Sequence, residues 1–95
     1  MTAYIIADIQ INDAEKFKEY SDRVPEFIRK YQARFIVRGG DPVNREGDWA
    51  PQRVVVVEFP SKSLAEAFLD DPQYQEIADI RRASTSGKLI IVEGC

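Results

Sequence analysis

Four consecutive valines, Val54 to Val57, restrict the fold of this 95-residue chain more than any other feature of its sequence. They belong to the segment Arg53–Phe59 (RVVVVEF), and valine favours strands because its β-branched side chain packs well on a pleated surface. A strand with one face in water alternates apolar and polar residues, whereas this run is apolar at both sets of positions. Residues 3–9 (AYIIADI) have the same character. The two segments therefore predict two central strands that are covered on both faces.

Residues 13–31 predict a long helix. Their large apolar side chains recur every three or four positions and so share one stripe of a helix. Asn12 and Glu15 have the spacing of a capping box at its start. Pro25 lies inside the stripe. Because proline lacks the N–H that would bond to the carbonyl of Ser21, we expect a kink or a break there.

A second helical region follows the valine strand. Ser61 or Ser63 is expected to cap its start, and Asp71-Pro72 has the residues of a second N-cap, so the helix begins again there. Two more strands are predicted at Arg34–Gly39 and at residues 88–93 (KLIIVE), the latter after a polar loop at residues 84–87 (STSG).

The resulting order is βαββαβ in a single domain over residues 1–95, which predicts an α+β fold. The simplest architecture with this order is a ferredoxin-like sandwich, in which two helices cover one face of a four-stranded antiparallel sheet. In this arrangement we expect the first and third strands to be parallel to each other and at the centre. Their central position agrees with the sequence, because they are the most apolar. The second and fourth strands carry charged residues and are expected at the edges.

Two helices leave one face of such a sheet without cover. In the valine strand, Val55, Val57 and Phe59 form one alternating set, and Val54 and Val56 belong to the other. Whichever set faces the helices, several large apolar side chains remain on the open face. Because burying them is worth several kcal/mol, at about 25 cal/mol per Å², we expect a homodimer that packs open sheet face against open sheet face.

Composition excludes several classes of function. Sixteen Asp and Glu against 13 Lys and Arg give a net charge of −3, so we expect no nucleic-acid partner. Histidine is absent, which removes the usual metal ligand sets and the Ser-His and Cys-His catalytic pairs. No Asp/Glu spacing indicates a metal site, and we expect no metal and no cofactor.

The sequence also bears on location. No apolar run approaches the roughly 20 residues that span a bilayer, and the N-terminus lacks the pattern of a signal peptide. A cytoplasmic location without membrane contact is therefore expected. The single cysteine, Cys95, cannot form a disulfide within one chain, and no neighbouring base activates its thiol.

Three residues are candidates for acid–base chemistry. Asp8 and Glu58 are expected near the carboxyl ends of the two central strands, where a pair of carboxylates would have one raised pKa. The structural alternative is that each lies at the solvated rim. Tyr20 would orient a substrate if it faced a cavity, although its place on a helix stripe is typical of core packing.

Arginines and aromatic residues form the candidate ligand site. Arg38, Arg53 and Arg81 are expected to gather at one end of the sheet together with Glu93, and Trp49 and Tyr4 would supply an aromatic wall. Such a group can hold a carboxylate or another planar anion. The structural alternative is that the arginines pair with Glu93 or Glu46. The connection at residues 41–52, which contains Trp49, is either a lid on the cavity or, as we favour, an arm on the partner subunit.

A set of short motifs spread over the whole chain resembles one family. They are Arg38-Gly39-Gly40, Glu46-Gly47 with Trp49, Pro51 and Arg53, Glu58-Phe59-Pro60-Ser61, Tyr74-Gln75, Ile80-Arg81 and Ile91-Val92-Glu93-Gly94. In combination they resemble domain of unknown function 1330, within the dimeric α+β barrel superfamily of ferredoxin-like proteins. The resemblance implies a homodimer whose two sheets form a barrel, and a cavity between sheet and helices. It implies no particular reaction, since the superfamily includes oxygenases, isomerases, haem-handling enzymes and stress-related proteins.

Three functions remain open on this basis. The first is a homodimer that binds a small anionic or aromatic metabolite in the cavity. The second is an enzyme, a cofactor-independent oxygenase or isomerase that uses carboxylate or tyrosine acid–base chemistry. The third is a structural or regulatory partner without a ligand site.

Overall fold

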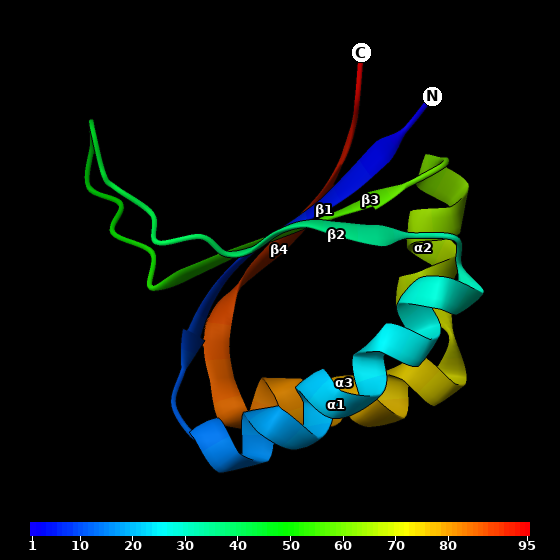
Figure 1. Ribbon diagram of the computed structural model, residues 1–95, viewed down its shortest axis with the longest axis horizontal. Coiled ribbons are helices and arrows are strands. Elements are labelled where there is room, and N and C mark those ends of the chain that lie inside the picture. Colours follow the sequence, from blue (N-terminus) through cyan, green and yellow to red (C-terminus); the bar gives the residue numbers. More distant parts are fainter.

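The sheet has four antiparallel strands in the order β2-β3-β1-β4, and three helices cover one of its faces (Figure 1). The computed structural model describes all residues 1–95. The elements are β1 (Ala3–Ile11), α1 (Ala14–Lys30), β2 (Arg34–Gly39), β3 (Arg53–Phe59), α2 (Lys62–Asp70), α3 (Pro72–Ser84) and β4 (Thr85–Glu93). The predicted βαββαβ order is confirmed, with the second helical region divided into α2 and α3. None of the helices is long and apolar enough to cross a bilayer.

β1 and β3 are central, as expected, but they are antiparallel and not parallel. Their register pairs Ile5 with Val57 and Ile9 with Arg53. β2 is also antiparallel to β3, so the crossover through α1 makes β1 and β2 run in the same direction and β3 reverses it. The expectation of parallel central strands was therefore wrong.

α1 is one continuous helix. Its N-cap is Asp13, one residue after the predicted cap, and the Asp13 carboxylate accepts a hydrogen bond from the Lys16 N–H at 3.1 Å. The helix passes through Pro25 without a break, so of the two predicted outcomes, a kink or a break, the break is wrong. Proline inside a helix costs about 3 kcal/mol, and the burial of Val24 and Phe27 on either side of it offsets this cost.

Asp71 divides α2 from α3. Ser61 caps α2 by accepting from the Leu64 N–H at 3.2 Å. Asp71 then caps α3 by accepting from the N–H groups of Gln73 at 2.8 Å and Tyr74 at 3.3 Å. The predicted restart of the helix at Asp71-Pro72 is confirmed.

The predicted loop at residues 84–87 is absent, because α3 ends at Ser84 and β4 begins at Thr85. The hydroxyls that suggested a loop bind carbonyls in the last turn of the helix. Ser84 donates to Ile80 at 2.7 Å and Thr85 donates to Arg81 at 2.6 Å. The carbonyl of Ser84 in turn accepts from the N–H of Asn12 at 2.8 Å, which joins the end of α3 to the start of α1.

The core lies between the sheet and the helices. Its buried members from the sheet alternate along β1 and β3, as a strand with one face toward the helices requires. The core residues are Ala3, Ile5, Ala7, Ile9, Val57 and Phe59 from the sheet, Val24, Phe27 and Ile28 from α1, Ala65 and Phe68 from α2, and Tyr74, Ile77 and Ala78 from α3. Phe68 and Tyr74 lie at its centre, with ring centroids 4.2 Å apart.

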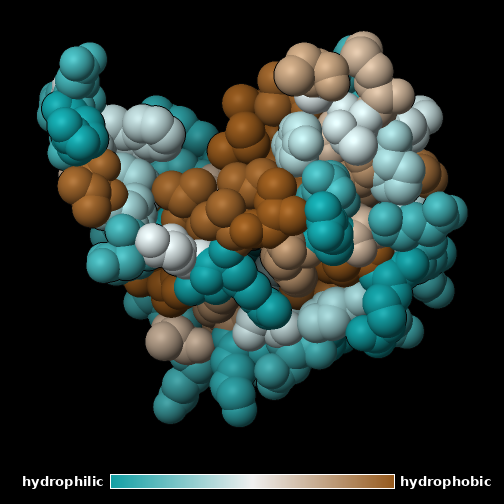
Figure 2. All heavy atoms as spheres, turned by 45° about the horizontal axis from the view of Figure 1, so that its top comes forward, coloured by the Kyte–Doolittle hydropathy of each residue, from teal (hydrophilic) through white to brown (hydrophobic).

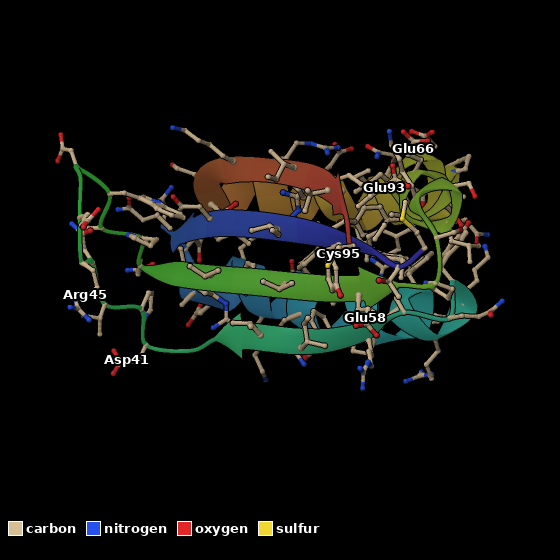
Figure 3. All side chains as sticks on the ribbon, turned by 90° about the horizontal axis from the view of Figure 1, so that it is seen from above. Asp41, Arg45, Glu58, Glu66, Glu93 and Cys95 are labelled. Carbon is tan, nitrogen blue, oxygen red and sulfur yellow. The ribbon has the colours of Figure 1, made fainter.

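The face of the sheet away from the helices is apolar and without cover. One row across it joins all four strands through Val37, Val56, Ile6 and Ile90. Ile90 is 57% exposed and its neighbour on β4, Val92, is 41% exposed. Figure 2 shows the apolar side chains gathered on this face, and Figure 3 views it from above. We call this surface the open face.

Residues 40–52 form an irregular, largely exposed connection between β2 and β3 that projects beyond the end of the sheet (Figures 1 and 3). We call it the arm. Two contacts hold it to β1. Trp49 Nε1 donates to Asp8 Oδ2 at 2.7 Å, and Gln52 Oε1 accepts from the N–H of Ile11 at 2.8 Å.

Candidate functional site

A cavity of about 60 Å³ lies between the helix-facing side of the sheet and the helices. It is lined by Ile5, Ala7, Ile9, Phe17, Tyr20, Ser21, Ile28, Arg38, Arg53, Val55, Val57, Phe68, Tyr74, Arg81 and Leu89. All of these side chains are apolar or aromatic except Ser21 and the three arginines. No carboxylate lines the cavity, so the arginines have no counter-ion within it.

Strand pairing and the position of α3 bring the three arginines to the cavity. Arg38 stands opposite Val55 near the end of β2, and Arg53 begins β3 opposite Ile9. Both therefore lie on the helix-facing side, at the two points where the arm leaves the sheet. Arg81 comes from the last turn of α3.

The three arginines differ in their burial and in the contacts that their guanidinium groups make. The Nε atoms of Arg53 and Arg81 are buried and have no hydrogen-bond partner. A buried donor without a partner costs about 1–3 kcal/mol, and more when the group is charged. Arg38 is exposed, and its guanidinium stacks over the ring of Phe35 at 4.4 Å from the ring centroid. Arg53 and Arg81 are thus the two arginines that have a buried Nε–H without a hydrogen-bond partner.

Gly39 makes room for Arg53. A Cβ atom at Gly39 would lie 3.1 Å from Arg53 Nη1, tighter than nine in ten real Cβ contacts. Its φ of +96° is also one that side-chain-bearing residues rarely adopt. The positive φ therefore favours glycine, and a Cβ at this position would make the end of the Arg53 side chain shift by a few tenths of an ångström.

Two tyrosine hydroxyls also belong to the cavity. Tyr20 and Tyr74 share a hydrogen bond of 2.8 Å between their hydroxyl oxygens. Burial raises the pKa of Tyr20, the neighbouring Tyr74 raises it further, and the Arg81 guanidinium opposes this only in part. Arg81 lies 5.9 Å from the centroid of the Tyr20 ring. Tyr20 therefore stays protonated at physiological pH and acts as a hydrogen-bond donor or acceptor.

The other predicted site residues lie elsewhere. Asp8 and Glu58 are not near each other, because the antiparallel register pairs Asp8 with Val54 and Glu58 with Tyr4. Asp8 is held by Trp49 near the arm, and Glu58 forms an ion pair with Arg34 at 2.9 Å toward the other end of the sheet (Figure 3). The expectation of a paired carboxylate was wrong for this reason.

Trp49, Tyr4 and Glu93 do not join the arginines either. Trp49 lies with Asp8 on the open face, and Tyr4 shares that face. Glu93 stands opposite Ala3, at the far end of β1 from Ile9. No group of three or more Asp, Glu, Cys or His side chains lies close enough to hold a metal ion.

Two side-chain contacts, one in the cavity and one outside it, were not predicted from the sequence. The helical spacing of Tyr74, Ile77 and Ile80 is typical of buried residues, but it does not identify Tyr74 as the hydroxyl partner of Tyr20. Asp71 was identified as an N-cap, but its second oxygen also accepts from Lys30 at 2.7 Å and from Tyr31 at 2.6 Å. These contacts, that with Lys30 foremost, lower the pKa of Asp71 and raise those of Lys30 and Tyr31.

Fold and site together define a ferredoxin-like α+β protein with an arginine-lined cavity between its sheet and helices. The model of the family described as "Domain of unknown function (DUF1330)" matches residues 2–95, and the chain belongs to that family. None of the curated proteins matches it.

Solved structures of similar fold include proteins of unknown function and an oxygenase. RPA0582 of Rhodopseudomonas palustris, a protein of unknown function, is 17% identical with a TM-score of 0.82, over 99% of this chain and 82% of the other. A dimeric ferredoxin-like protein of unknown function from Jannaschia sp. is 12% identical with a TM-score of 0.78, over 99% and 100%. SnoaB, a cofactor-independent oxygenase from Streptomyces nogalater, is 14% identical with a TM-score of 0.70, over 99% and 93%. At these identities the similarity shows the fold alone, and it confirms the predicted ferredoxin-like class.

Proposed function

We propose that this protein is a homodimeric binding protein that holds a small anionic or aromatic metabolite in the cavity between sheet and helices. The observation that carries the proposal is the pair of buried arginine Nε atoms without partners, from Arg53 and Arg81. They lie in a cavity whose lining contains no carboxylate. An anion would satisfy both donors and offset their charge.

The open face supports the dimer. Its central row, Val37, Val56, Ile6 and Ile90, is apolar on all four strands. Exposed apolar patches of this kind mark partner surfaces, and a two-fold axis would cover both copies with one contact. The Jannaschia protein of the same fold is described as dimeric, which agrees with this arrangement.

The binding experiment is a thermal-shift screen with small carboxylates, phosphates and neutral aromatics at millimolar concentration. A compound that binds only the folded state raises Tm, by an amount equivalent to about 2.7 kcal/mol at 100 times its Kd. We expect at least one anionic or aromatic compound to raise Tm by several degrees. If no compound of either class does so, the binding function is wrong.

Arg81 and Arg82 offer a matched pair of variants for this screen. Arg81 faces the cavity, whereas its neighbour Arg82 pairs with Asp79 at 2.6 Å on the surface. Arg81→Gln should abolish the thermal shift of the best compound, and Arg82→Gln should leave it unchanged. Equal losses in the two variants would indicate binding at the surface of α3 and not in the cavity.

A second candidate function is a cofactor-independent oxygenase or isomerase. The Tyr20–Tyr74 hydroxyl pair favours it, because its free hydroxyl hydrogen could bind and orient the reacting group of a substrate. The carboxylates Asp8 and Glu58 do not line the cavity and offer no support. The test is oxygen uptake and product formation with each compound that binds. Turnover that is lost in Tyr20→Phe while binding is kept would favour the enzyme over the binding protein.

A further inference from the structure

The free donors of the cavity come from both of its walls. Arg53 offers its Nε–H from the sheet and Arg81 offers its Nε–H from α3. Tyr20 and Tyr74 add a third donor, because a mutual bond between two hydroxyls uses one hydrogen and leaves the other free. The hydroxyl of Ser21 already donates to the carbonyl of Lys18 at 3.2 Å. The cavity therefore lacks a group that accepts several hydrogen bonds at one place.

A carboxylate matches this set of donors better than the alternatives. Its two oxygens accept about four hydrogen bonds, and arginine binds them through parallel N–H groups. A neutral amide has one oxygen, and its own N–H groups would face the arginine donors. A phosphate dianion would bring a second charge into an apolar site, which costs more to desolvate.

The rest of the lining determines the body of the ligand. Aliphatic side chains from β1, β3 and β4, and mostly aromatic ones from the helices, surround the arginines, and the free volume is about 60 Å³. A polar or long body would leave its own groups without partners there. The body is accordingly compact and apolar.

Arg81 also lines a second pocket that adjoins the cavity. This pocket is a polar groove of about 130 Å³, which Arg81 lines together with Arg82, Thr85 and Lys88, and the groove shares Ile9, Arg81 and Leu89 with the cavity. No acidic residue lines this groove. An anion can therefore approach Arg81 through a basic surface between α3 and β4.

We infer that the ligand is a small monocarboxylate with a compact apolar or aromatic body, whose carboxylate lies between the guanidinium groups of Arg53 and Arg81. This inference rests on the proposed function and adds the chemical class of the ligand. It also assigns the selection of monocarboxylates to Arg53 on the sheet and Arg81 on α3.

Isothermal titration with four matched probes tests the ligand class on the intact protein. Benzoate has the head group and the body, benzamide is its neutral counterpart, phenyl phosphate replaces the head group, and acetate lacks the body. We expect benzoate to bind most tightly. Loss of the charge-assisted hydrogen bonds should weaken benzamide by about 10-fold or more, and loss of the buried ring should weaken acetate by a similar factor.

The outcomes separate this inference from the proposed function. If phenyl phosphate or benzamide binds as tightly as benzoate, the cavity binds a ligand but the carboxylate class is wrong. If acetate equals benzoate, the apolar body is wrong. If none of the four probes binds and the broader thermal-shift screen also finds no compound, both proposals fail. If only the broader screen succeeds, the proposed function stands and the ligand class is wrong.

Lysine variants test the role of the two arginines without removing charge. Arg53→Lys and Arg81→Lys keep the cation but lose the planar fork of N–H groups, so each should weaken benzoate by about 10-fold. Arg23→Lys, at an exposed position of α1 that lines neither the cavity nor the groove, is the control and should bind as the wild type does. Circular dichroism and Tm of each variant establish that it is folded. Full benzoate affinity in folded Arg53→Lys and Arg81→Lys would overturn the assigned geometry.

Discussion

Trp49 Nε1 and Asp8 Oδ2 lie 2.7 Å apart, and this hydrogen bond ties the arm to the central strand β1 on the open face. Apart from this hydrogen bond, residues 48–50 are exposed, and the arm has no helix or strand. The indole is 56% exposed in the single subunit. The arm thus lies beside the surface that the proposed dimer would cover, with an aromatic side chain available for the partner.

Removal of this hydrogen bond should release the arm. In Asp8→Ala, trypsin should cut after Arg45, near the tip of the arm, several times faster than in the wild type, because local opening governs cleavage. The measurement is the rate of appearance of the two fragments by mass spectrometry. Glu58→Ala serves as the control, since Glu58 lies on the same face at the other end of the sheet. Equal cleavage rates in Asp8→Ala and wild type would show that the contact does not hold the arm.

A charge in the central row of the open face should prevent dimer formation. Ile90→Glu places a carboxylate beside Ile6 and opposite the partner sheet. Burying an unpaired charge costs several kcal/mol, so the dimer Kd should rise by more than about 100-fold. Light scattering after size exclusion at micromolar concentration should report a dimer for the wild type and a single subunit for the variant.

The control for this variant is Ala67→Glu, which changes an exposed residue of α2 on the helix side of the molecule. It should remain dimeric. A wild-type protein that is a single subunit at these concentrations would remove the dimer from the proposed function while leaving the cavity in place.

Asp71 should make stability depend on pH in acid. Hydrogen bonds from Lys30 and Tyr31 hold its pKa below the ordinary value of about 3.9. A carboxylate with a lowered folded pKa stabilises the protein above its unfolded pKa, and this contribution is lost as the pH falls toward the folded pKa. Asp71→Asn should therefore be less stable than the wild type at pH 7, with the difference shrinking below about pH 4.

Urea denaturation from pH 7 to pH 2.5 or so measures this difference. Asp70→Asn provides a neighbouring control, because Asp70 is exposed and makes no ion pair. A gap between Asp71→Asn and wild type that stays constant across the pH range would mean that the ionised Asp71 is not the stabilising form.

Most helices and strands of the fold could be predicted from local sequence patterns. The predictions that were wrong depend on long-range geometry. The valine run and residues 3–9 predicted central strands because each segment is apolar at both sets of alternating positions. The relative direction of β1 and β3 depends instead on the crossover through α1. The wrong expectation that these strands are parallel led to the expectation that Asp8 lies beside Glu58. The polar run at residues 84–87 predicted a loop because hydroxyl residues favour turns. In the folded chain the same hydroxyls bind carbonyls of α3.

The predictions of the site divide in the same way between local pattern and long-range geometry. Arg38 and Arg53 flank the arm in the sequence, so their meeting on adjacent strands follows from the β2–β3 pairing. The position of Trp49 could not be predicted, because it depends on the path of an irregular arm and not on a strand or helix period. The bond between Tyr20 and Tyr74 depends on the packing of α1 against α3, which neither helix stripe specifies.

Gly39 and Gly47 provide a matched pair that separates backbone strain from crowding of Arg53. Both have positive φ, +96° and +78°, but a Cβ at Gly39 would press on Arg53 whereas a Cβ at Gly47 would meet nothing within 4 Å. Alanine at either position should cost about 1–2 kcal/mol of stability through strain. Only Gly39→Ala should also displace the guanidinium and weaken benzoate by about 10-fold, since a charge-assisted hydrogen bond is lost. Denaturation and titration of both variants test this, and equal benzoate affinities would mean that the position of Arg53 does not depend on the missing side chain of Gly39.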